Sequence, residues 1–175
     1  MFYTIGHSAR SLEEFLTLLH TCKVEQLVDV RKLPGSRRYP HFDSEPLADA
    51  LHDAGIGYER LEPLTGRRPV SHDIPFETNA WWQNRSFHNY ADHALSTEFQ
   101  EGLSALRDTG RTQPTAIMCS EAVWWRCHRR IIADHLLAHR EEVSHIIDVE
   151  NMASASLSAG ATVDAEGIVT YPATS

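Results

Sequence analysis

The chain has 175 residues, a formal net charge of −8, and 42% hydrophobic and 23% charged residues. This length suits one domain with its own hydrophobic core, and the acidic balance argues against a protein that coats duplex nucleic acid through bulk electrostatics. The sequence contains no apolar run long enough for a membrane span and no secretory signal at its start. Its three cysteines are too few for a disulfide scaffold, so we expect a reducing, cytoplasmic setting.

Five segments have the short apolar pattern of buried strands. In chain order they are Phe2–Ile5, Gln26–Arg31, 56–61, 114–119 and 143–148. Helical patterns separate them, and this alternation predicts a mostly parallel sheet covered by helices on both faces. We therefore predict a single α/β domain over residues 1–150, with a sheet of about five strands.

The helices are predicted from apolar spacing and from their end signals. Ser11 and Glu14 form a capping-box pair at the start of the first helix, and Ser44 is expected to cap the second. A third helical stretch runs over about 87–106 with a break near Ser96. A fourth covers 127–139.

Two segments lack a regular pattern. Residues 62–85 are rich in Pro, Thr and Asn and predict a long irregular insertion, a kind of loop that is often functional. Residues 151–175 form a small polar tail. We expect this tail to be loosely attached and to hold at most a weak hairpin around 164–167.

Polar residues gather where the predicted strands end. In an open parallel sheet, ligands bind at this edge. The first two strands lead into His7, Ser8, Asp29 and Arg31, and the last two lead into Cys119, Ser120, Glu121, Asp148 and Glu150. His128 and Arg129 fall in the first turn of the last helix, whose free N–H groups favour an anion. The sequence therefore predicts one shared functional rim.

We assign acid–base and anion-binding roles to this rim. The expected catalytic residues are His7, Asp29, Glu121 and His128, with Glu121 or Asp29 as general base and a histidine as proton carrier. The expected anion-binding residues are Ser8, Arg31, Arg38, Arg67, Arg68 and Arg129, because arginine donates paired hydrogen bonds to phosphate or carboxylate. We expect no metal and no cofactor. The predicted partner is a small anionic or nucleotide-like ligand, or a short nucleic acid, and not a membrane.

Cys119 and Cys127 leave other chemistry open. A cysteine at a strand end, facing a helix N-terminus and arginines, is expected to have a lowered pKa and to be nucleophilic. Here Arg126 follows Cys119 after six residues that include no glycine, unlike rhodanese and cysteine-phosphatase loops. A metal site of Cys119, Cys127 and His128, with or without His7, matches none of the usual zinc spacings. A redox pair of the two cysteines is disfavoured by a reducing setting.

A non-catalytic nucleic-acid-binding or regulatory module is a further alternative. Four tryptophans accompany the arginine clusters, and aromatic rings can stack on unpaired bases. They are Trp81, Trp82, Trp124 and Trp125. The oligomeric state is not indicated by the sequence.

Four motifs resemble the prokaryotic domain-of-unknown-function family numbered 488. They are "TIGHSARSLEEFLTLL", "LVDVRKLPGSRRYPHFD", "LTGRR" and "MCSEAVWWRCHRRIIADHL", in this order over about residues 4–148. Thr65 and the pair Trp124–Trp125 depart from the residues common in the family. The resemblance implies a single α/β domain and marks the same strand-end residues. It points to nucleotides or nucleic-acid bases as ligands and supplies no mechanism, so the leading hypothesis is an enzyme or binding protein for a nucleotide or nucleic-acid phosphate.

Overall fold

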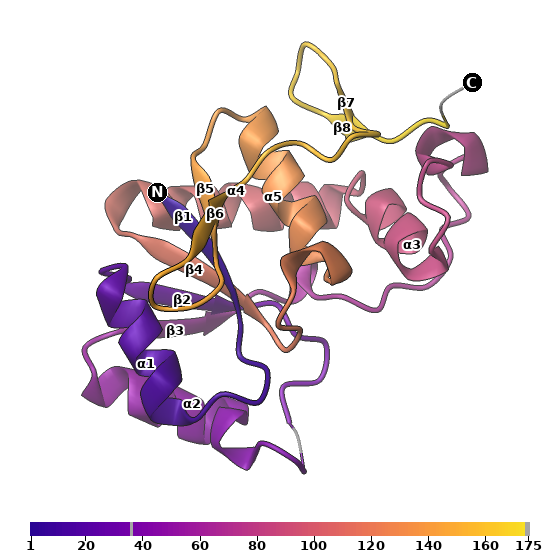
Figure 1. The fold of residues 1–175 in the computed structure, drawn as a ribbon. Helices are drawn as coiled ribbons and strands as arrows, with labels where there is room; N and C mark the ends of the chain where they lie inside the picture. The colour runs from indigo at the N-terminus through magenta and orange to yellow at the C-terminus, as the bar shows by residue number, and fades with distance from the viewer. Residues whose placement is uncertain (36, 174–175) are drawn as a thin grey trace.

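A mostly parallel sheet forms the centre of the protein (Figure 1). The structure is a computed structural model that describes residues 1–35 and 37–173. The sheet order is β3-β2-β4-β1-β5-β6, with β1 to β5 parallel and β6 antiparallel to β5. The strands are β1 (Phe2–Gly6), β2 (Gln26–Asp29), β3 (Gly57–Arg60), β4 (Thr115–Cys119), β5 (Val143–Ile146) and β6 (Met152–Ser154). The predicted α/β class is confirmed.

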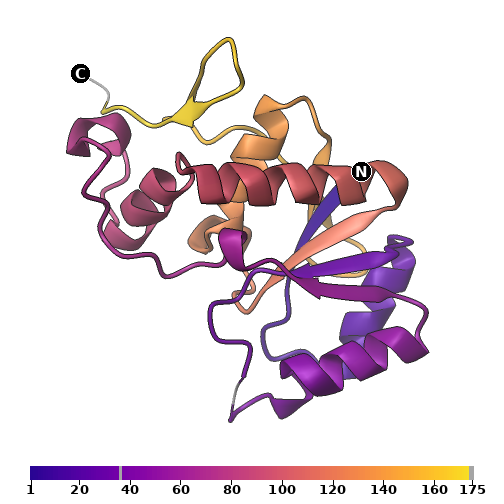
Figure 2. The same cartoon turned by 180° about the vertical axis from the view of Figure 1, so that it is seen from behind.

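Helices cover both faces of the sheet, as predicted (Figure 2). They are α1 (Leu12–Thr21), α2 (Ser44–Asp53), α3 (Arg85–His93), α4 (Thr97–Thr112) and α5 (Arg129–Ala138). One apolar cluster joins α1 and α2 to the sheet through side chains such as Phe15 and Leu47. A second cluster joins α4 and α5 to the other face through side chains such as Leu103 and Ile132. β4 is buried at every residue because it lies between β2 and β1 and under both layers.

The helix ends follow the sequence signals with two corrections. The capping box of Ser11 and Glu14 is present, and Ser96 caps α4 by accepting a hydrogen bond from the backbone N–H of Phe99. The predicted break near Ser96 is therefore confirmed. Ser44, however, is the first helical residue of α2, and the extended residue before it, Asp43, is the N-cap. The helix predicted from residue 127 begins at Arg129, because a 3-10 turn, η4 (Trp124–Arg126), and an extended Cys127 precede it.

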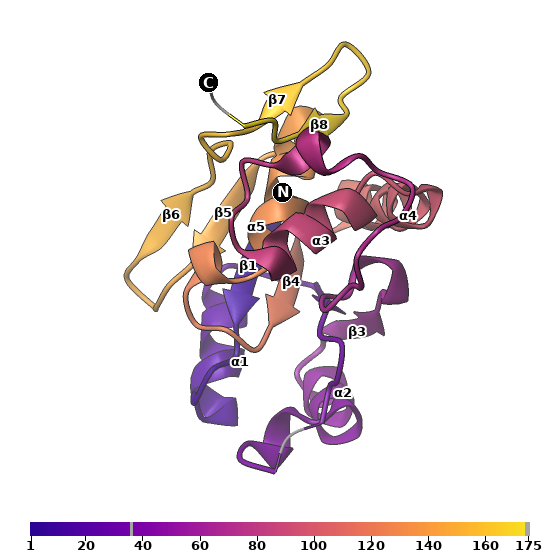
Figure 3. The same cartoon turned by 90° about the vertical axis from the view of Figure 1, so that its right-hand side faces the viewer.

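The carboxy-terminal segment packs firmly on the domain, so the expectation of a loosely attached tail is wrong. β6 extends the sheet, and β7 (Thr162–Val163) and β8 (Val169–Thr170) form a hairpin beside α5 (Figure 3). The Tyr171 ring is fully buried, and its hydroxyl donates to Asp134 Oδ2 at 2.7 Å. A few such anchors outweigh the polar composition of the segment, because each buried aromatic ring removes a large apolar area from water.

No helix in the described ranges is both long and apolar enough to cross a membrane.

Three histidines, two of them buried and one at the pocket wall, stay neutral well below neutral pH. Burial lowers the pKa of His135 to about 3, and that of His128 and His145 to about 4. Neither ring nitrogen of His135 has a hydrogen-bond partner among the described residues. The folded pKa of His135 lies below its ordinary value of 6.5, so the unfolded state binds the extra proton. Its share of stability is therefore lost as the pH falls from about 6.5 toward about 3.

We expect His135→Leu to stabilise the protein, and to do so more strongly at about pH 5 than at about pH 7.5, because the buried imidazole is unpaired and takes up a proton on unfolding. The gain at the higher pH should be about 1–3 kcal/mol, the cost of an unsatisfied buried polar group. Urea unfolding of parent and variant at both pH values measures it. If parent and variant lost the same unfolding free energy between about pH 7.5 and about pH 5, His135 would not be the buried group that takes up a proton on unfolding.

Candidate functional site

A buried arginine contacts a cysteine sulfur at the end of the central strand. Arg129, in the first turn of α5, is 1% exposed. Its Nη1 donates to Cys119 Sγ at 2.6 Å and to the backbone oxygen of Glu121 at 2.6 Å, and its Nη2 donates to the oxygen of Ala122 at 3.2 Å. No ion pair of the described chain joins Arg129 to a carboxylate. A buried guanidinium requires a counter-charge, so the contact favours the thiolate form of Cys119.

Cys127 completes this arrangement. Its thiol donates to Cys119 Sγ over a sulfur–sulfur distance of 2.8 Å. Burial by itself raises the pKa of Cys119, but the hydrogen bond from Cys127 and the charge of Arg129 outweigh burial and lower that pKa to about 7. Burial and the neighbouring Cys119 raise the pKa of Cys127 well above its ordinary value. Of the two thiols, Cys119 therefore ionises first, while Cys127 keeps its proton.

The end of β1 supports the same loop. The N–H groups of His7 and Ser8 donate to the backbone oxygens of Cys119 and Ser120. A Cβ at Gly6 would lie 1.8 Å from the Glu121 oxygen and 2.9 Å from Arg129 Nη1. Glycine is required at this position because β1 passes directly against the loop that Arg129 holds.

His128 holds the start of α5 against β2 and the insertion. Its Nε2 lies 3.0 Å from the Val30 oxygen, which can only accept, so Nε2 carries the hydrogen and Nδ1 faces Cys127 Sγ at 3.6 Å. The ring packs on Tyr90 with 4.8 Å between centroids. A Cβ at Gly66 would lie 2.8 Å from Nδ1. Burial lowers the pKa of His128 to about 4, so the ring is neutral at neutral pH, and its role as a proton carrier stays a prediction.

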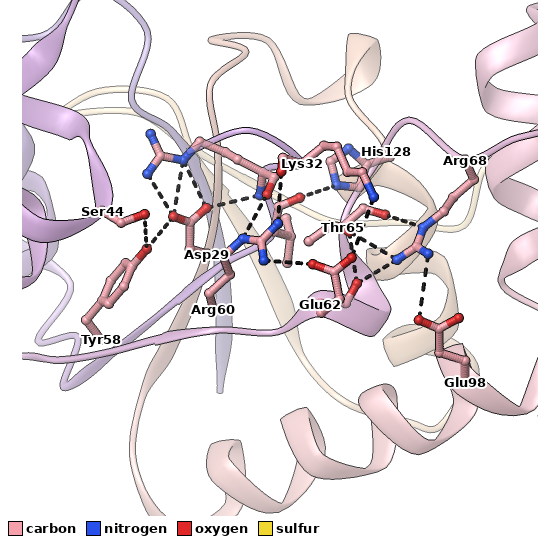
Figure 4. Close-up of polar contacts among 12 residues, drawn as sticks. Asp29, Lys32, Ser44, Tyr58, Arg60, Glu62, Thr65, Arg68, Glu98 and His128 are labelled. Atoms are coloured by element: carbon pink, nitrogen blue, oxygen red, sulfur yellow. Dashed lines mark hydrogen bonds and ion pairs between the residues drawn. The ribbon is translucent and has the colours of Figure 1, made fainter. Parts of the chain in front are cut away.

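A second buried arginine lies beside the first group. Arg31 binds both carboxylate oxygens of Asp29, at 3.0 Å from Nε and 2.7 Å from Nη2, and its Nη1 lies 3.3 Å from His7 Nε2. The Tyr58 hydroxyl donates to the same carboxylate at 2.6 Å (Figure 4). Burial lowers the pKa of His7. Asp29 is fully buried, and its carboxylate orients Arg31, while its role as general base stays a prediction.

A cavity of about 590 Å³ opens above these groups. Its lining includes four cationic side chains from three segments, together with one carboxylate and both cysteines. These are Arg31, Lys32, Arg67, Arg126, Glu121, Cys119 and Cys127. The aromatic residues Phe87 and Tyr90 line it as well. The pocket is locally positive although the chain as a whole is acidic.

Several residues of the predicted rim lie elsewhere. Arg68 donates to the backbone oxygens of Thr65 and Glu62 and pairs with Glu98, so it braces the insertion (Figure 4). The Arg38 guanidinium lies 6.0 Å over the Tyr39 ring. Among the residues that the structure describes, neither arginine lines the pocket.

The other predicted site residues either line the pocket or support the residues that line it. Arg31, Arg67, Glu121 and His128 line the pocket, whereas His7, Asp29 and Arg129 lie behind it, and Ser8 holds the β4 loop through its backbone. Asp148 and Glu150 form the turn between β5 and β6, where Asp148 Oδ1 accepts from two backbone N–H groups. Lys32 and Arg126 also line the pocket, although the sequence pattern predicted no role for either. The described residues contain no group of three or more side chains suited to hold a metal ion.

Residues 11–136 match the family model described as "Domain of unknown function DUF488". The chain belongs to this family. The resemblance predicted from the four motifs is thereby confirmed, and the match includes Cys119, Cys127 and Arg129. No curated protein and no solved structure matches the chain.

We expect Gly66→Ala to displace His128 and to destabilise the protein by about 1–3 kcal/mol, the usual cost of overpacking. Gly35→Ala is the matched control, because a Cβ at Gly35 would meet no described atom within 4 Å, and it should change stability by no more than about 0.5 kcal/mol. Urea unfolding measures both. Equal stability of the two variants would show that the Gly66–His128 contact does not constrain the site.

Proposed function

We propose that this protein is an enzyme that uses the Cys119 thiolate as a nucleophile on an anionic small molecule bound in the basic pocket. The observation that carries the proposal is the 2.6 Å contact between the buried Arg129 Nη1 and Cys119 Sγ at the wall of this pocket. The proposal keeps the anion site of the leading sequence hypothesis and joins it to the thiol alternative, with Cys119 as the nucleophile.

The thiolate is the reactive form of cysteine. With a pKa of about 7, roughly half of Cys119 is ionised at neutral pH. Such a thiol combines a large thiolate fraction with good intrinsic nucleophilicity, because nucleophilicity falls when the pKa falls further. Cys22 differs, since burial raises its pKa.

The lining favours an anionic ligand. Arg31 is fixed by Asp29 and leaves Nη1 directed toward His7, while Arg67 and Arg126 are exposed at the same pocket. Fixed cationic groups in a concave site concentrate anions near the reactive atom. A volume of about 590 Å³ lies within the usual range for small-molecule sites, so a nucleotide or a molecule of similar size would fit.

Glu121 is the pocket residue best placed to carry a proton. Its side chain is exposed, and it lines the pocket two residues after Cys119 in the chain. Asp29 cannot share this task while it binds Arg31 and Tyr58. The acid–base role therefore goes to Glu121 in the proposal.

The nucleic-acid-binding alternative has weaker support. Trp82 is buried, Trp81 packs against Tyr171, and Trp124 stacks on His145 with 4.3 Å between ring centroids. Trp125 is 48% exposed. Three of the four rings proposed as stacking platforms are thus engaged within the fold, which favours a small-molecule ligand.

We expect iodoacetamide to alkylate Cys119 faster than an ordinary thiol at neutral pH in a Cys22→Ser protein, and pyrophosphate or a nucleoside monophosphate to slow the reaction by occupying the pocket. In the double variant Arg67→Ala, Arg126→Ala, the anion concentration that halves the alkylation rate should rise on the order of tenfold or more, because charge-assisted hydrogen bonds to the anion are lost.

Arg111→Ala is the control, since Arg111 pairs with Asp108 on the surface of α4. Arg111→Ala should leave the anion concentration that halves the alkylation rate unchanged. Slow alkylation of Cys119 that no anion affects would overturn the proposal.

A further inference from the structure

We propose that Cys127 is the resolving thiol of a two-cysteine cycle, and that the pocket reduces an anionic substrate carrying an electrophilic sulfur, such as an anionic disulfide. This rests on the proposed function, because the cycle begins with the Cys119 thiolate. It adds the class of substrate and the role of the second cysteine.

The two sulfurs are in contact before any reaction. Cys119 ends β4 and Cys127 follows η4, and their sulfur atoms lie 2.8 Å apart. Arg129 holds the intervening loop closed through the backbone oxygens of Glu121 and Ala122. The backbone N–H of Arg129 also donates to Cys127 Sγ at 3.4 Å. Cys127 is therefore positioned to attack Cys119 Sγ once that sulfur is part of a mixed disulfide.

The proposed cycle balances in three steps. The Cys119 thiolate attacks one sulfur of the substrate, a Cys119–substrate disulfide forms, and the other sulfur leaves as a thiolate with the bonding electron pair. Cys127 then gives up its proton, which neutralises a departing thiolate, and attacks Cys119 Sγ. A Cys119–Cys127 disulfide forms and the second half of the substrate leaves. The substrate has gained two electrons and the cysteine pair has lost two, and an external dithiol, or two monothiols, reduces the pair again.

The electrostatics of the site suit this sequence of attacks. Besides burial, the charge and the hydrogen bond of Cys119 raise the pKa of Cys127. Both influences disappear when Cys119 becomes part of a mixed disulfide. The Arg129 charge and its backbone N–H, which lower the pKa of Cys127, remain. The single negative charge of the site can thus pass from one sulfur to the other while its buried counter-charge stays in place.

The second thiol also selects the kind of substrate. An acyl or phosphoryl group on Cys119 is released by water, and a thiol in contact with it contributes nothing to that hydrolysis. A mixed disulfide is released by a thiol. The contact between Cys127 and Cys119 therefore favours sulfur as the attacked atom.

The test uses oxidised glutathione, an anionic disulfide, with reduced protein and mass spectrometry after acid quenching. The Cys22→Ser protein should lose two hydrogens, carry no adduct and release two glutathione molecules. In the same Cys22→Ser protein, either Cys127→Ser or Cys127→Ala should stop the reaction at the mixed disulfide, with one glutathione bound to Cys119. Adding Cys119→Ser should prevent the reaction. Bis(2-hydroxyethyl) disulfide, which is uncharged, should react more slowly because it gains nothing from the basic pocket.

The outcomes separate this inference from the function on which it rests. Retention of glutathione on Cys119 whether or not Cys127 is present would overturn the resolving role and leave the nucleophile intact. Failure of oxidised glutathione to react, with iodoacetamide still labelling Cys119 rapidly, would overturn the sulfur substrate alone. Failure of both reagents would overturn the proposed function as well.

Discussion

One buried positive charge organises the functional end of this protein. The Arg129 guanidinium lies in the interior without a carboxylate partner among the described ion pairs. Its stability there depends on the Cys119 thiolate and on two backbone oxygens of the following loop. The same contacts close the loop and bring Cys127 onto Cys119. They also explain Gly6, because a side chain there would displace the loop oxygen or the guanidinium.

The site separates positioning from binding. Arg31 and Arg129 are each held by a buried anionic group, Asp29 in one case and the Cys119 sulfur in the other. Arg67 and Arg126 are exposed at the same pocket and remain available to a ligand. Buried charges with fixed partners beneath exposed surface charges give a pocket in which the reactive sulfur is held in place and the exposed arginines are available to an anion.

The sequence predicts the frame of the protein better than its chemistry. Alternating strand and helix patterns are local, and they predicted the parallel sheet, the helices on both faces and the gathering of polar residues at strand ends. Whether a polar residue faces a ligand or another residue is a tertiary property. Asp29 and Arg31, two residues apart, satisfy each other. Arg129 turns inward to a sulfur and Arg68 braces the insertion, and neither of these partners follows from spacing. The expectation of a loosely attached tail failed for a related reason. Burial of one ring, Tyr171, anchors the segment, and composition does not show which residue will be buried.

The pKa of Cys119 tests the central claim most directly. Ultraviolet thiolate absorbance of the Cys22→Ser protein, measured against pH, reports Cys119 first, because the pKa of Cys127 lies well above its ordinary value. We predict a midpoint near pH 7, and an upward shift in Arg129→Met because the counter-charge is lost. A midpoint at the ordinary thiol value of 9.0, unchanged by Arg129→Met, would contradict it.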